Sequence, residues 1–157
     1  MAVDREALIR KIEELPGQLE SVLRGVGDKE LDTRYREGGW TARQVVHHLA
    51  DSHMNAFIRT RLIVTEQHPT LKPYDQDAWA LLEDSKAPVG ISLDLLRGLH
   101  ARWAVFLRSL PEEAWSRSGV HPEIGEVTMD QILASYAAHG ERHLGHVRLA
   151  LERASQA

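Results

Sequence analysis

Three of the nine histidines lie close together near the C-terminus, at positions 139, 143 and 146. His139 and His143 are four residues apart, and on a helix this spacing places two imidazoles on one face, one turn or ~6 Å apart. Two imidazoles at this spacing can bind the same metal ion. The spacing therefore indicates a candidate metal site on the last helix of the chain.

These histidines also occupy positions where a helix normally carries its buried apolar residues. Counting heptads from Met129 gives the core-facing a and d positions, which are Met129, Ile132, Tyr136, His139, His143, His146 and Ala150. A buried imidazole without a partner costs about 1–3 kcal/mol, so each histidine needs a ligand or a hydrogen bond. Two interpretations stay open at this point: a metal site, or a network of core histidines.

The run from His139 to His143 differs from the zinc-protease motif H-E-x-x-H, in which the general base directly follows the first histidine. Here Gly140 follows His139 and is expected to leave room on the same face. Glu141 lies about 200° around the helix from His139 and faces away. The last helix therefore supplies candidate ligands but no general base.

A site for one metal ion needs a third ligand, and the region after Trp40 offers His47, His48 and His53. The apolar face of that predicted helix is defined by Val46, Leu49, Ala56, Phe57 and Ile63. His53 lies near the centre of this face, whereas His48 lies near its edge, about 100° or more from the centre, and His47 lies farther away. Periodicity alone therefore favours His53.

Four long stretches with helical periodicity must position these histidines. The expected helices cover residues 4–23, 41–66, 92–110 and 128–153. Four amphipathic helices in one chain indicate an all-α fold, an antiparallel four-helix bundle. The connections 67–91 and 111–127 are long enough to form functional loops or to cross an end of the bundle.

Local signals set the expected ends of these helices. Thr41 and Thr128 are each followed three residues later by glutamine, which indicates a capping box. Ser92 is a good N-cap for the third helix, and Pro111 ends it. Pro16 is expected to kink or break the first helix. Two shorter features are expected in the connections, a short helix over residues 75–82 and a loop with a short extended piece over 115–127.

Length and composition limit the class of protein. We expect the 157 residues to form a single domain over 1–157. The 19 Lys and Arg against 23 Asp and Glu give a net charge of −4, which argues against a nucleic-acid partner. The absence of cysteine excludes disulfides and thiolate zinc sites and is typical of a reducing cytoplasm. No run approaches the ~18 apolar residues of a membrane span, so we expect a cytoplasmic protein without a membrane partner.

The segment from Gly38 to Asn55, GGWTARQVVHHLADSHMN, resembles the YfiT-like branch of the DinB superfamily, as do the sequence KPYD at 72–75 and the C-terminal histidines. The resemblance extends over nearly the whole chain. It implies a four-helix bundle that forms homodimers and holds one divalent ion, zinc or nickel, on three histidines. The family's pattern takes one histidine eight residues after a tryptophan and two from a His-x3-His sequence. Carried over, these are His48, His139 and His143.

The resemblance and the periodicity disagree on the third ligand. We follow the resemblance, because a helix at a dimer interface can carry two apolar faces that obscure its pattern. His53 and His146 then become residues that orient a ligand or line the pocket. Asp51, one turn after His48, becomes a candidate partner of a ligand imidazole, although a solvated carboxylate is an equally good interpretation. The two remaining candidates have ordinary interpretations as a helix-edge histidine, His100, and a loop histidine, His121.

A three-histidine site supports hydrolysis of a small molecule through metal-bound water, whose pKa falls to about 7 on such an ion. Many members of the branch are named as metal-dependent hydrolases. Tyr74 and Asp75 are expected to line the pocket, and no side chain is identified as catalytic. Two alternatives stay open. One is an S-transferase acting on an external thiol of the bacillithiol or mycothiol type, and the other is a bundle that binds metal or ligand without catalysis.

Overall fold

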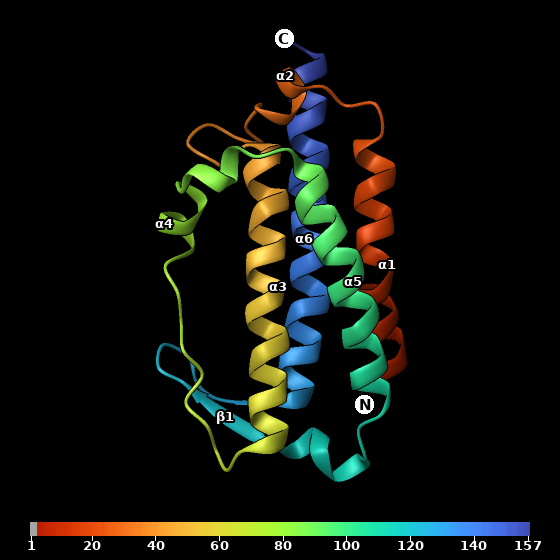
Figure 1. Ribbon diagram of the computed structural model, residues 1–157, viewed down its shortest axis with the longest axis vertical. Helices are drawn as coiled ribbons and strands as arrows, with labels where there is room; N and C mark the ends of the chain where they lie inside the picture. The colour runs from red at the N-terminus through yellow and green to blue at the C-terminus, as the bar shows by residue number, and fades with distance from the viewer. Residues whose placement is uncertain (1–2) are drawn as a thin grey trace.

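Four long helices form a bundle in the computed structural model, which describes residues 3–157 (Figure 1). They are α1 (Arg5–Leu23), α3 (Ala42–Thr65), α5 (Val89–Arg108) and α6 (Met129–Ser155). The predicted all-α four-helix bundle is confirmed. Within residues 3–157, none of these helices combines the length and the apolar character that crossing a bilayer requires.

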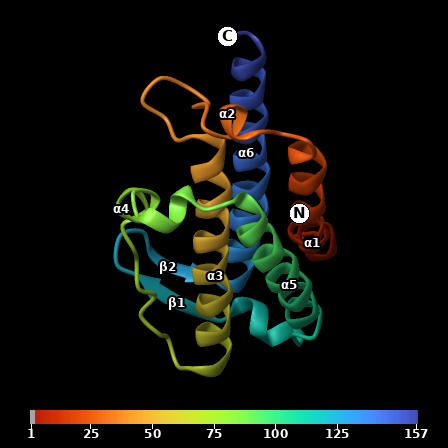
Figure 2. The ribbon, with the colours of Figure 1, turned by 45° about the horizontal axis from the view of Figure 1, so that its top comes forward.

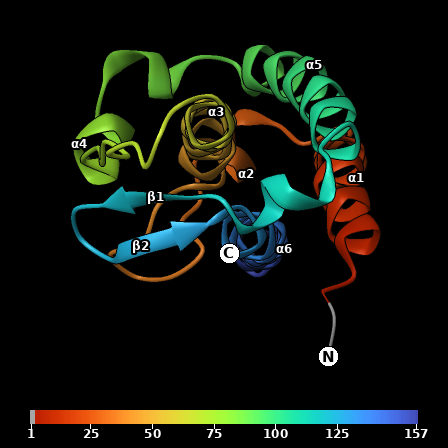
Figure 3. The same cartoon turned by 90° about the horizontal axis from the view of Figure 1, so that it is seen from below.

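The order and direction of the helices determine where the connections run. Both α1 and α3 pack against α5 and α6, so the order around the bundle is α1, α5, α3, α6 (Figure 3). In Figure 1, α1 and α6 run upward and α3 and α5 downward. The antiparallel neighbours are therefore α1 with α5 and α3 with α6. Because α3 and α5 run parallel, the chain between them must return along the full length of the bundle.

That return connection forms one side of the molecule, beside α3 (Figure 2). It contains α4 (Gln76–Ala80), as the predicted short helix, and the 3-10 helix η1 (Glu83–Lys86). The segment before α6 is more regular than predicted. It holds the 3-10 helix η2 (Glu112–Ser116) and an antiparallel hairpin of β1 (Ser118–His121) and β2 (Gly125–Thr128). Gly125, with φ +83°, accommodates the turn, and a bridge from Thr70 to Val120 joins the hairpin to the return connection.

Both predicted capping boxes are present. The side chain of Thr41 accepts from the backbone of Gln44 at the start of α3, and Thr128 does the same with Gln131 at the start of α6. The predicted N-cap at Ser92 is wrong, because α5 already begins at Val89, after Pro88. The Ser92 hydroxyl lies 2.7 Å from a ring nitrogen of His47 instead.

Pro16 does not break α1, which continues through it. Its neighbours Leu15 and Leu19 are buried in the core, and this packing keeps the helix whole despite the missing N–H. The same proline leaves the carbonyl of Ile12 without its partner four residues later, so that this carbonyl is available to another donor.

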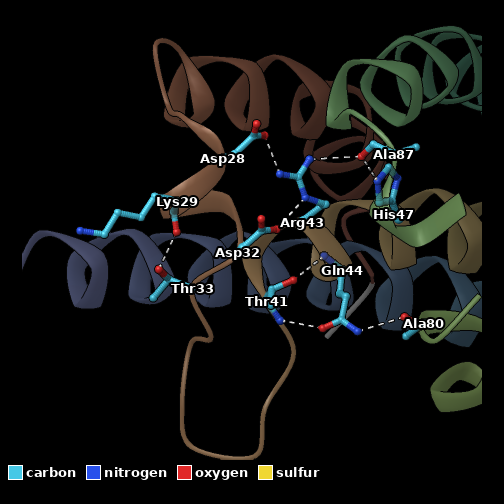
Figure 4. A network of polar contacts seen from close by, with 10 residues as sticks. All are labelled: Asp28, Lys29, Asp32, Thr33, Thr41, Arg43, Gln44, His47, Ala80 and Ala87. Atoms are coloured by element: carbon cyan, nitrogen blue, oxygen red, sulfur yellow. Dashed lines mark hydrogen bonds and ion pairs between the residues drawn. The ribbon is translucent and has the colours of Figure 1, made fainter. Parts of the chain in front are cut away.

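A buried arginine holds the short α2 (Asp28–Leu31) and the start of α5 to α3 (Figure 4). Arg43 pairs with Asp28 and Asp32, each at 2.7 Å, and its guanidinium also donates to the Ala87 carbonyl at 3.3 Å. His47 contacts the same carbonyl at 2.9 Å. These contacts fix the N-terminal half of α3, which carries the histidines of interest.

The apolar core is divided into two clusters. One, at the end of the bundle near the hairpin, contains Ile9, Ile12, Ala56, Trp103 and Ala137 among its buried members. The other, at the end near α2, contains Leu15, Leu49, Leu96, Leu144 and Val147. On each helix the two clusters are separated by a few residues, and on α3, α5 and α6 these intervening residues include histidines. A layer of imidazoles therefore interrupts the core.

Gly140 lets α1 approach α6 rather than making room for the histidine before it. A Cβ at Gly140 would lie 2.8 Å from Cδ2 of buried Leu15, whereas a Cβ at Gly145 on the same helix would meet nothing within 4 Å. We expected Gly140 to leave room for His139, and this expectation was wrong, because the space is taken by Leu15.

We predict that Gly145→Ala raises the free energy of unfolding by about 0.5–1 kcal/mol, because alanine is the better helix former. Gly140→Ala gains the same propensity but must displace Leu15, so it should be less stable than Gly145→Ala by about 1–3 kcal/mol. Urea unfolding of metal-free protein measures both. Equal stability of the two variants would contradict the close packing of α1 on α6.

Candidate metal centre

Two antiparallel helices bring three imidazoles together. His48 comes from α3, and His139 and His143 come from adjacent turns of α6. One ring nitrogen from each lies within 4.8 Å of the other two. The Nε2 atoms of His48 and His139 are 3.3 Å apart. Two nitrogens bound at about 2.0–2.1 Å in a tetrahedral zinc site are separated by about 3.3 Å, so this spacing suits a shared ion.

Burial keeps these three imidazoles neutral. It lowers the pKa of His48 to about 4, that of His139 to about 3 and that of His143 to about 2, with smaller contributions from neighbouring charges, Arg142 among them. A metal ion binds only the neutral imidazole, which offers a lone pair. At neutral pH the three side chains are therefore in the protonation state that a divalent ion requires.

Two further histidines contact members of this group of three at their Nδ1 atoms. His53 Nε2 lies 3.1 Å from Nδ1 of His139, and His146 Nδ1 lies 3.3 Å from Nδ1 of His143. His53 is fully buried and was the choice by periodicity, but the structure places it behind His139, and His48 completes the group of three. His53 lies at the centre of the apolar face of α3 and therefore points into the bundle core. The three histidines His48, His139 and His143 meet to one side of this core.

Asp51 does not take the first of its two interpretations, and His100 does not lie where the sequence suggested. No hydrogen bond joins Asp51 to His48 within the described residues, and burial together with Asp84 raises the pKa of the Asp51 carboxyl to about 6. His100 is not at the edge of its helix face but fully buried, with Nε2 2.9 Å from Nδ1 of His53. The helix-edge interpretation of His100 was wrong because α5 packs against both α1 and α3, and His100 contacts Ile12 of the one and His53 of the other.

Aromatic side chains cover the end of the site near α2. The Trp40 ring lies 4.6 Å from the His48 ring and 6.4 Å from the His143 ring, measured between centroids. Tyr35 stacks on His146 at 4.1 Å with an interplanar angle of 7°. Trp40 therefore packs on the rings of His48 and His143 from the start of α3.

A cavity of about 700 Å³ opens beside His139. The return connection and the hairpin form its walls, and Tyr74 and Asp75 line it as predicted, together with His121. Burial raises the pKa of the Tyr74 phenol to about 12, so this hydroxyl stays protonated. A second opening of about 500 Å³ reaches His139 and His143 from the side of Trp40.

Arg59 is a cavity residue that the sequence analysis missed. Its guanidinium donates to the Tyr136 hydroxyl at 3.2 Å and to the Lys72 carbonyl at 2.5 Å, and both acceptors are neutral. Its buried Nε has no partner among residues 3–157. The available signal was its spacing, because a residue eleven positions after His48 lies only about 20° from it around the helix.

The buried imidazoles make the stability of the metal-free protein depend on pH. Unfolding lets each of them take up a proton near pH 6.5, while the folded state resists protonation to about pH 4 or below, so acid favours the unfolded chain. We predict that the free energy of unfolding is greatest above pH 6.5 and falls by up to about 1.4 kcal/mol per pH unit for each such imidazole below it.

Urea unfolding at pH 7.5, 6.0 and 5.0 in the presence of chelator measures this dependence. Asp51 acts in the opposite direction, because its raised pKa means that the folded state takes up its proton first. Because the effect of this single carboxyl is opposed by that of several imidazoles, we still expect the free energy of unfolding to fall as the pH is lowered. A free energy of unfolding that is constant from pH 7.5 to 5.0 would contradict the burial of the imidazole layer.

Comparison with known proteins identifies the family of this chain. The DinB superfamily matches residues 11–147. A protein of Oceanobacillus iheyensis named "Putative metal-dependent hydrolase" is 48% identical over 139 residues, which cover 88% of this chain and 81% of that protein.

Two solved structures share the fold. YfiT of Bacillus subtilis, described as "a probable metal-dependent hydrolase with an unusual four-helix bundle topology", aligns with a TM-score of 0.93 and 41% identity over 98% of this chain and 90% of that one. The mycothiol-dependent maleylpyruvate isomerase aligns with a TM-score of 0.71 and 18% identity over 92% of this chain and 61% of that one, a likeness in fold alone. With the family match over most of its length, this chain belongs to the DinB superfamily.

Proposed function

We propose that this protein is a metal-dependent hydrolase of a small molecule, with one divalent ion held by His48, His139 and His143. The observation that carries the proposal is the convergence of three neutral imidazole nitrogens within 4.8 Å beside a cavity of about 700 Å³. The names of the relatives from Oceanobacillus and Bacillus support the same activity. Imidazole ligands suit both zinc and nickel, and we propose one of these as the ion.

The number of ligands favours a catalytic site over a structural one. Structural zinc sites have four protein ligands, whereas catalytic sites have three and keep a position for water or substrate. When bound, a divalent ion lowers the pKa of a coordinated water to about 7 and supplies hydroxide at neutral pH. Because all three ligands are neutral, none of the charge of the ion is cancelled by its ligands.

The side chains of the cavity suit a substrate with an apolar part and an anionic group. Ile124, Val127 and Ile132 provide an apolar wall. Arg59, whose buried Nε has no hydrogen-bond partner among residues 3–157, and the Tyr74 hydroxyl, which burial keeps protonated, are donors for an anion. We propose that these two side chains orient the substrate while the ligand histidines hold the ion.

A second candidate function is S-transfer from a low-molecular-weight thiol. The observation that favours it is the presence of two openings, both lined by Gln76 and His139, which offer space for two reactants. A thiol bound to a metal ion is deprotonated, and the chain itself has no cysteine, so the thiol must be supplied from outside. A bundle that binds metal without catalysis would show neither activity.

We further propose that the protein is a cytoplasmic homodimer. Apolar side chains on α3 and α5 that are exposed in the single chain, Ile58, Ile91, Leu95 and Val105, support self-association.

We predict that purified wild-type protein, grown without an affinity tag, carries about one zinc or nickel ion per chain by mass spectrometry, and that His48→Ala and His143→Ala lose it. His47→Ala is the matched control, because His47 is the adjacent residue on α3 and is similarly buried, and its ring contacts Ser92 and the Ala87 carbonyl. Retention of metal in both ligand variants, with circular dichroism showing that they are folded, would exclude this site.

We predict that the metal-loaded protein hydrolyses esters, amides or phosphate esters that carry a carboxylate faster than their neutral analogues, and that chelation abolishes this activity. The same panel is assayed with and without added bacillithiol or mycothiol. Turnover without thiol supports the hydrolase, and turnover only with thiol supports the transferase. Metal binding without turnover in either arm would contradict both enzymatic functions.

A further inference from the structure

A buried chain of hydrogen bonds crosses all four helices and ends at a proposed metal ligand. It starts at the Ile12 carbonyl in α1, which accepts from Nδ1 of His100 in α5 at 2.5 Å. His100 Nε2 lies 2.9 Å from Nδ1 of His53 in α3, and His53 Nε2 lies 3.1 Å from Nδ1 of His139 in α6. The helices are consecutive neighbours around the bundle, so each step is one contact between adjacent helices (Figure 3).

Pro16 explains why the chain can start at Ile12. In an uninterrupted helix the carbonyl of residue 12 accepts from the N–H of residue 16, but proline has no N–H to donate. The Ile12 carbonyl is therefore left without this partner inside the apolar core, where a free backbone acceptor is costly. The imidazole of His100 supplies the missing donor.

The carbonyl at the start of the chain fixes every proton in it. A carbonyl oxygen can only accept, so His100 must carry its proton on Nδ1. A neutral imidazole has one donor and one acceptor nitrogen, so Nε2 of His100 accepts and His53 must carry its proton on Nδ1. By the same step His139 is protonated on Nδ1. His53 and His100 are both 0% exposed, and bulk water is therefore not in contact with either ring.

The result is a lone pair aimed at the proposed metal site. With its proton on Nδ1, His139 has a bare Nε2, the nitrogen that lies 3.3 Å from Nε2 of His48. In free neutral histidine the two tautomers exchange, and only one of them offers Nε2 to an ion. We propose that a hydrogen-bond relay locks His139 in its metal-binding tautomer. This relay consists of the Ile12 carbonyl, which Pro16 leaves free, and the imidazoles of His100 and His53. His53 and His100 are thus positioning residues.

The inference rests on the proposed metal site, but it concerns groups that do not touch the ion. Mutation of the residue that is hydrogen-bonded to a ligand histidine typically weakens metal binding by about 10–100-fold. Here two imidazoles, His53 and His100, connect the ligand His139 to the Ile12 carbonyl in α1, which Pro16 leaves without its helical partner. The relay therefore predicts that a residue on α5 outside the ligand group controls affinity for the ion.

The first test determines which ring nitrogen of each imidazole carries the proton. Long-range ¹H–¹⁵N spectra of ¹⁵N-histidine-labelled wild-type protein at pH 7.5 distinguish the two tautomers of each imidazole, with single-histidine variants for assignment. We expect His53, His100 and His139 to be protonated on Nδ1 in the metal-free protein and to stay so with zinc. Protonation of His53 or His139 on Nε2 in the metal-free protein would overturn the relay.

The second test measures zinc affinity by competition with a chromophoric chelator. Phenylalanine at 53 or 100 fills the space but neither donates nor accepts, whereas glutamine offers one donor and one acceptor. We expect His53→Phe and His100→Phe to bind zinc about 10–100-fold more weakly than wild type and the glutamine variants to bind within about threefold of it. Trp103→Phe is the packing control, because its ring contacts both His53 and His100 edge-on.

The outcomes separate the relay from the proposed function. Equal weakening by phenylalanine and glutamine, or no weakening by either, would overturn the relay. If the phenylalanine variants do not fold, the glutamine variants and the tautomer spectra still decide. If wild-type protein binds no zinc or nickel, the proposed function fails, while the tautomers of the metal-free protein test the relay independently.

Discussion

A layer of imidazoles lies between the two apolar halves of the core, and its burial constrains how the four helices pack. Its members come from α3, α5 and α6 and are His48, His53, His100, His139 and His143. Buried polar atoms must find partners, because each unsatisfied group costs about 1–3 kcal/mol. Two of the imidazoles satisfy both ring nitrogens by contacts with one another, with a backbone carbonyl and with His139. The other three converge on one point, which is what a shared ion would require.

The same constraint relates the site to the topology of the bundle. The parallel course of α3 and α5 requires a connection that returns along the side of the molecule (Figure 1). Residues of this connection line the cavity beside His139. It contributes Tyr74 and Asp75, while the hairpin before α6 contributes His121. A bundle with short connections throughout would carry the imidazole layer without this cavity next to it. The long connections are therefore part of the site.

Much of this could be predicted from local sequence. The two capping boxes, the four long helices and the pair His139 and His143 depend on residues close together in the chain, and periodicity finds such features. The third member of the group could not be chosen in this way. Periodicity reports how deeply a residue of α3 points into the core, so it selected His53. The group needs the residue whose ring nitrogen comes close to both His139 and His143, which is His48. Resemblance to a family supplied that choice.

The remaining misses share a physical cause, which is contact between distant segments. The partner of His100 is a carbonyl made available by a proline 84 positions earlier in the chain, Pro16, and no local pattern links the two. Ser92 is a good N-cap by type, but tertiary contact gives its hydroxyl to His47 instead. The charge on Arg59 is informative only once the return connection is seen to enclose it. Each of these residues was visible in the sequence, but its partner was not.

The proposed function requires His48, His139 and His143 to hold one divalent ion. Anomalous diffraction from a crystal of the zinc-loaded protein, with data above and below the zinc edge, would locate that ion. We expect a single strong anomalous peak per chain at about 2.0–2.1 Å from a ring nitrogen of each of the three histidines. A peak bound instead by surface carboxylates such as Asp28 and Asp32, or one that replaces His48 by His53 as a ligand, would contradict it.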